Sequence, residues 1–128
     1  MEIKWYNPNI KSPTVSIASY GLIFSNGAIE VLNSPKYILL GFSKEESILY
    51  IKPTDAKTET AIEFYSKFDT RSNYIRINDK NFVKFLESQL ADEWKFTNRV
   101  IKFDAKWDEE NELLLVKIDK SLENDEED

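Results

Sequence analysis

The feature of this sequence that most constrains its fold is an order of predicted elements that occurs twice. Residues 14–53 and residues 61–120 each give, in turn, a strand, a tight turn, a strand, a short helix, a strand, a turn and a strand. A shift of 53 residues carries Ser25, Ile29 and Leu32 onto Asn78, Phe82 and Phe85. A shift of 65 residues carries Ile38, Leu40, Phe42, Ile48 and Tyr50 onto Phe103, Ala105, Trp107, Leu113 and Leu115. The difference of 12 residues is one insertion, at residues 88–99. The sequence therefore predicts two halves of one design.

Length and hydrophobic content indicate that the two halves share a core. The chain has 128 residues, of which 41% are hydrophobic, which is enough for one globular domain. A half of about 40 to 60 residues would be marginal alone. We therefore predict a single domain over residues 1–121. Its class is α+β, a β-rich barrel built from two fused strand–strand–helix–strand–strand halves.

Local patterns place the individual elements. Strands are expected at residues 14–19, 22–24, 37–42, 48–52, 74–77, 99–107 and 112–118, with a polar linker at residues 54–60. Ser25 and Asn78 are expected to cap the two helices, the second with Phe82, Phe85, Leu86 and Leu90 on one face. In residues 61–68, Ile62, Phe64 and Phe68 alternate as in a strand, although Ala61, Ile62, Tyr65 and Phe68 also fit helical spacing. The repeat favours the strand.

The net charge of −6 is unevenly distributed along the chain. Residues 1–53 carry five lysines against four acids, and residues 54–121 carry twelve basic side chains against fourteen acids. Residues 122–128 hold five acids and no base, and we expect this acidic tail to be disordered. Because the remainder is close to neutral, nucleic acid stays open as a partner.

The composition excludes several kinds of chemistry. There is no cysteine and no histidine, which excludes disulfides, thiolate nucleophiles, classical zinc sites and histidine acid–base catalysis. The sequence contains no P-loop, dinucleotide fingerprint or nucleophile elbow. We therefore predict neither an enzyme nor a bound cofactor. No segment approaches the roughly 20 apolar residues of a membrane span, and the N-terminus lacks a signal-peptide pattern. A cytoplasmic protein without membrane contact is expected.

Five basic residues of the second half are candidates for phosphate contacts: Lys67, Arg71, Arg76, Lys80 and Lys84. Arg76 stands between two isoleucines on a predicted strand, so it should face away from the buried side. Lys80 and Lys84 are four residues apart and share a helix face. Tyr74 adds a group on which a base could stack. Nearby acids would equally make this an ordinary solvated surface.

Aromatic residues outside the repeat are candidates for an interface with a protein partner or a second copy. Trp5 and Tyr6 precede the repeat, and Trp94 lies in the insertion of the second half. Trp107 aligns with Phe42 and is expected in the core. The carboxylates of residues 108–112 lack the ligand spacing of a calcium loop, so we predict a solvated turn and no metal site.

The order hairpin, short helix, hairpin around Gly21-Leu22-Ile23-Phe24-Ser25 resembles the swapped-hairpin barrel of the SpoVT/AbrB family. The tandem arrangement is similar to that of the MraZ proteins, which carry two such modules in one chain. In that family the first hairpin and the helix rim form a DNA-binding face, and the barrel closes by exchange between two copies. The resemblance implies that one chain supplies both copies here. This chain has Leu22 where the family has an arginine, and Ser25-Asn26 where a proline opens the family helix.

Two functional interpretations follow. In the first, the protein is an AbrB-like, non-enzymatic nucleic-acid-associated or transcription-regulatory protein whose second half contacts DNA. In the second, it is a protein-interaction module that has kept the barrel and lost DNA binding, since the chain is also similar to small accessory proteins of unknown role from bacteria and phages. The acidic tail and Leu22 favour the second interpretation, whereas the topology favours the first.

Overall fold

The computed structural model describes residues 2–3, 5, 12–69, 71, 73–91 and 93–118. These form one antiparallel sheet of nine strands in the order β5-β3-β4-β9-β8-β1-β2-β7-β6. In chain order the strands are β1 (Thr14–Ala18), β2 (Gly21–Phe24), β3 (Tyr37–Ser43), β4 (Ile48–Thr54), β5 (Ile62–Glu63), β6 (Phe68–Asp69), β7 (Tyr74–Asn78), β8 (Val100–Asp108) and β9 (Leu113–Lys117). The helices are α1 (Asn26–Val31), α2 (Lys80–Gln89) and the 3-10 turn η1 (Tyr65–Lys67).

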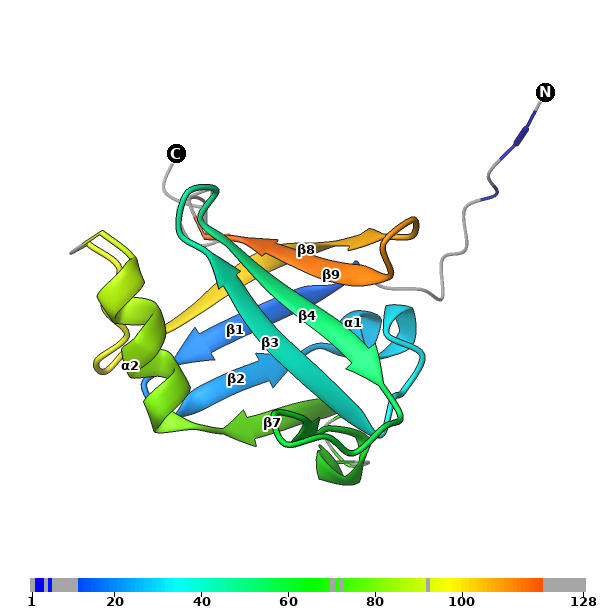
Figure 1. Ribbon diagram of the computed structural model, residues 1–128, viewed down its shortest axis with the longest axis horizontal. Coiled ribbons are helices and arrows are strands. Elements are labelled where there is room, and N and C mark those ends of the chain that lie inside the picture. The colour runs from blue at the N-terminus through cyan, green and yellow to red at the C-terminus, as the bar shows by residue number, and fades with distance from the viewer. Residues whose placement is uncertain are drawn as a thin grey trace.

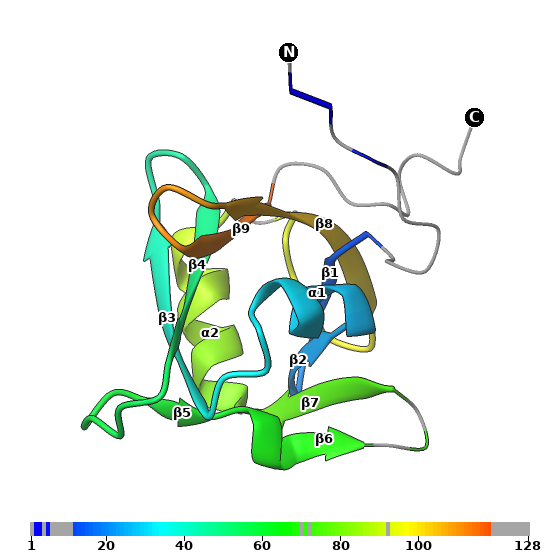
Figure 2. The same cartoon turned by 90° about the vertical axis from the view of Figure 1, so that its right-hand side faces the viewer.

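The sheet curls into a half-barrel, with β3 and β4 crossing in front of β1 and β2 (Figure 1). The helices α1 and α2 lie at opposite ends of the curl (Figures 1 and 2). The inner faces of the strands supply the core, as alternation predicts: Val15, Ile17, Leu22, Phe24, Ile38, Leu49, Ile51, Ile75, Ile101, Phe103, Leu114 and Val116 are all buried. The structure thus agrees with the predicted β-rich α+β class.

Two ladders join the first half of the chain to the second in a specific register. β2 pairs with β7 so that Ile23 lies opposite Arg76. β4 pairs with β9 so that Tyr50 lies opposite Leu115. A third ladder, β1 with β8, sets Val15 against Phe103.

The prediction of one strand over residues 61–68 is wrong in its middle. Only the ends of this segment are extended: β5 pairs with β3 at one edge of the sheet, and β6 pairs with β7 at the other. Between them the chain turns through η1, where the backbone N–H groups of Phe64 and Tyr65 donate to the carbonyls of Lys36 and Pro35. The side chain of Phe64 is buried edge-on against Phe24, with 4.9 Å between ring centroids. One straight strand could not reach both edges, so the segment breaks.

The cap of the second helix is one residue later than predicted. Ser25 caps α1 as expected, but the side chain of Asp79, not that of Asn78, accepts a hydrogen bond from the Phe82 N–H at 3.0 Å. The buried face of α2 consequently consists of Val83 and Leu86. The assignment of Phe85 to that face is therefore wrong.

The insertion at residues 88–99 extends the second helix and adds a loop. Phe96 of this loop is fully buried, and its N–H donates to the Glu87 carboxylate at 2.8 Å. Within the described part of the chain, no helix combines the length and the apolar character needed to cross a membrane. The predicted acidic tail, residues 122–128, lies outside the described residues.

Candidate nucleic-acid interface

Arg76 occupies the outer face of β7, as its place between Ile75 and Ile77 predicted. Both isoleucines are buried, and the arginine side chain is exposed. Its Nε donates a hydrogen bond to Oδ1 of Asn78, at 3.1 Å. Its Cζ lies 4.0 Å from the centroid of the Tyr20 ring, within the range of a cation–π contact. The guanidinium group is thus held in place by two neighbours while its outer surface stays open.

Tyr20 is a member of this cluster that the sequence did not identify. It belongs to the turn between β1 and β2, and its carbonyl accepts the Asp79 N–H at 2.8 Å. Gly21 lets the turn come this close: its φ is +151°, and a Cβ there would clash with the Ile77 carbonyl and lie 2.9 Å from the Asp79 nitrogen. The Tyr20-Gly21 dipeptide signalled a turn, but only the pairing of β2 with β7 shows what the turn rests on.

Two adjoining hollows surround Arg76. The first, of about 690 Å³, is shallow and is lined by Tyr20, Arg76, Asn78, Asp79, Lys80 and Asn81. The second, of about 240 Å³, is lined by Ile62, Glu63, Lys67, Arg76, Ile77, Asn78 and Asp79. Because they share Arg76, Asn78 and Asp79, we treat them as one feature, the Arg76 groove. It runs from Lys67 across β7 to the first turn of α2.

Three of the five predicted basic residues, Lys67, Arg76 and Lys80, line this groove. The two carboxylates among them are already engaged. Asp79 caps α2, and Glu63 forms an exposed ion pair with Lys67 at 3.9 Å. Since such an exposed pair is worth little in water, Lys67 remains able to approach an anion.

The other two predicted basic residues stand apart from both hollows. Arg71 is exposed in the turn between β6 and β7, and Lys84 is exposed one helical turn beyond Lys80. The expected shared face of Lys80 and Lys84 therefore extends the positive surface along α2. Tyr74, proposed as a stacking group, is half-buried on β7 and is not among the groove residues.

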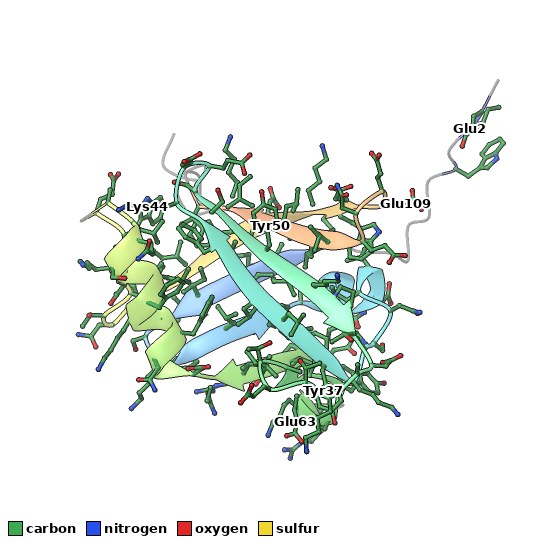
Figure 3. All side chains as sticks on the ribbon, in the orientation of Figure 1. Glu2, Tyr37, Lys44, Tyr50, Glu63 and Glu109 are labelled. Carbon is green, nitrogen blue, oxygen red and sulfur yellow. The ribbon has the colours of Figure 1, made fainter. Side chains whose placement is uncertain are left out.

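The acidic turn between β8 and β9 is explained by local hydrogen bonds. The side-chain amide and the backbone N–H of Asn111 donate to the Asp108 carboxylate at 2.8 and 3.2 Å, which lowers the pKa of Asp108. Glu109 lies at the tip of this turn, and Lys44 at the tip of the β3–β4 hairpin, both far from Glu63 in Figure 3. Among the described residues, no group of three or more acidic side chains gathers as a metal site would require.

The predicted interface aromatics differ in position. Trp5 is 83% exposed, and Tyr6 lies outside the described residues. Trp94 is half-buried, with its ring 5.5 Å from that of Phe103. Trp107 also packs against the core, as its alignment with Phe42 predicted. Comparisons of the chain with protein-family models, with curated proteins and with solved structures gave no match.

Proposed function

We propose that this protein is a non-enzymatic, nucleic-acid-associated barrel that carries both copies of an AbrB-like swapped-hairpin module in one chain. The Arg76 groove is its contact surface. The duplication and the binding activity rest on separate observations, and each has its own support.

The register of the sheet supports the duplication. In a twofold arrangement, a residue on the axis faces its own equivalent. A shift of 53 residues carries Ile23 onto Arg76, and these two residues lie opposite each other. A shift of 65 residues carries Tyr50 onto Leu115, and they too lie opposite each other. Both offsets come from the sequence, so the two ladders test the repeat independently.

The exchange between halves has a similar counterpart. Val15 of β1 faces Phe103 of β8 in the second half. In the other direction, Ile62 of β5 faces Ile38 of β3 in the first half. The shift of 65 carries Ile38 onto Phe103, so the two pairings are equivalent. The broken segment β5–η1–β6 then corresponds to β1.

One observation carries the proposed binding activity: the Arg76 guanidinium is held over Tyr20 and tied to Asn78, in a groove flanked by Lys67 and Lys80. Arginine and lysine supply the charge for phosphate contacts, and a fixed guanidinium plane can also stack on a base. The groove lies in the second half, where the sequence concentrates its candidates.

The test is a fluorescence-anisotropy titration of the full chain with labelled DNA and RNA, at salt from about 20 to 200 mM. We expect Arg76→Ala combined with Lys80→Ala to weaken binding at low salt and to reduce the salt slope by about 0.7–0.9 for each phosphate that the variant no longer neutralises. The control, Lys44→Ala combined with Lys57→Ala, removes two exposed charges away from the groove and should bind as the wild type does. Absence of binding at the lowest salt, or an equal weakening in the control, would contradict the proposal.

A separate surface favours the protein-interaction alternative. The outer face of β3, β4 and β9 presents half-buried apolar side chains that do not belong to the core: Leu39, Ile48, Tyr50, Leu113 and Leu115. Exposed apolar surface of this kind is typical of interfaces. If the face binds a second copy, light scattering should show a mass that rises with concentration, and Leu115→Lys should abolish the increase.

A further inference from the structure

We infer that the Arg76 groove is built for single-stranded rather than double-stranded nucleic acid, an inference that rests on the proposed function. The first argument comes from the charge of the groove. Its lining holds three cations, Lys67, Arg76 and Lys80, and two carboxylates, Glu63 and Asp79. Duplex DNA carries a charge about every 1.7 Å and is bound chiefly through many phosphate contacts. A groove with so few cations offers a duplex little of that attraction.

The second argument comes from the geometry of Arg76. Its guanidinium is covered on one side by the Tyr20 ring at 4.0 Å and fixed at Nε by Asn78. Within the described part of the chain, its two terminal nitrogens make no hydrogen bond. The open side of this layer is a stacking platform for a base. In a duplex each base already stacks on its neighbours, so only an unpaired base can use the platform.

The third argument concerns the groups beside the platform. Asn78 and Asn81 line the same hollow, and an amide side chain can both donate to and accept from a base edge. Lys67 and Lys80 lie on either side of Arg76, one on η1 and the other on α2. A strand laid along the groove would therefore place phosphates near both lysines and a base over the arginine. Stacking platforms combined with a positive groove are typical of proteins that bind single strands.

The experiment compares three probes on the full chain by fluorescence anisotropy. They are a labelled single strand of about 12 nucleotides as DNA, the same strand as RNA, and the duplex made with its complement. We expect at least one single strand to bind about tenfold more tightly than the duplex, with a salt slope of about 2 for three phosphate contacts.

Substitutions separate stacking from charge. Arg76→Lys keeps the charge but removes the planar group, so single-strand affinity should fall about tenfold while duplex binding stays unchanged. Tyr20→Ala should have the same effect, and Tyr20→Phe, which keeps the ring, should bind as the wild type does. Circular dichroism checks that each variant is folded. If Tyr20→Ala fails to fold, Arg76→Lys carries the test, because that side chain is exposed.

The outcomes distinguish the inference from the function on which it rests. A duplex that binds as tightly as either single strand, or Arg76→Lys with undiminished single-strand affinity, overturns the inference and leaves the proposed function standing. Failure of all three probes to bind at low salt overturns both.

Discussion

Replacing Gly21 by alanine should destabilise the protein more than any other single methyl addition to a glycine of its strands. Gly21 opens β2 with a φ of +151°, a conformation that side chains of L-residues rarely adopt. The substitution adds one carbon atom at the point where the β1–β2 turn rests on the junction of β7 and α2. It therefore tests whether this close approach holds the two halves together.

The expected destabilisation can be worked from the geometry. A non-glycine residue in such a backbone conformation costs about 1–3 kcal/mol. The new Cβ would also clash with the Ile77 carbonyl and lie 2.9 Å from the Asp79 nitrogen, so β2 and β7 must separate locally. The separation weakens the Gly21–Asn78 pairing and the hydrogen bond from Asp79 N–H to the Tyr20 carbonyl, each worth about 1 kcal/mol. The sum is about 3–5 kcal/mol, a large part of the roughly 5–15 kcal/mol by which domains are stable.

Urea denaturation followed by tryptophan fluorescence and circular dichroism measures this change in the free energy of unfolding. Gly41→Ala is the matched control, because a Cβ at Gly41 would meet no atom within 4 Å. It should change the free energy of unfolding by about 1 kcal/mol or less. The reasoning fails if Gly21→Ala unfolds within about 1 kcal/mol of the wild type, or if the two alanines cost the same.

Two further predictions concern the core and the acidic turn. Phe64→Ala should cost about 3–5 kcal/mol in thermal or urea denaturation, because the ring is fully buried against Phe24, whereas Phe85→Ala, at a side chain 47% exposed, should cost about 1 kcal/mol or less; equal costs would contradict the burial. Asn111→Ala should raise the pKa of Asp108 toward its ordinary value, as followed by NMR titration of the carboxyl carbon. Since the folded-state pKa is lowered, the stabilisation by Asp108 is complete above the unfolded pKa and disappears as pH falls through the folded value. An unshifted pKa in the variant would show that Asn111 is not the cause.

Local pattern was enough to predict most of the strands and the caps. Val15 and Ile17 alternate with polar residues and form β1, and the hairpin of β3 and β4 lies where its apolar run predicted. The error at α2 is a choice between adjacent residues, since Asn78 and Asp79 are both good capping residues. The apolar pattern could have decided it. Only a cap at Asp79 puts Val83 and Leu86 four and seven residues later, where Ile29 and Leu32 follow Ser25.

The rest of the candidate site depends on contacts between distant parts of the chain. Arg76 was found because its strand alternation is local. Tyr20 was missed because its ring meets Arg76 only through the pairing of β2 with β7. The break at η1 was missed for a related reason: Phe64 and Tyr65 bend to satisfy carbonyls at residues 35 and 36, which no pattern within residues 61–68 reveals.

The pairing of β1 with β8 also governs how the chain acquires its structure. Val15 and Phe103 are partners in one ladder although 88 residues separate them. During synthesis at about 5–20 residues per second, the first hairpin leaves the ribosome several seconds before its neighbour exists. Throughout that interval one edge of β1 is an open row of backbone donors and acceptors, able to pair with another nascent chain. Sheets dominated by such distant pairings fold in milliseconds to seconds, so the yield of native protein should depend on how crowded and how warm its surroundings are while the second half is being made.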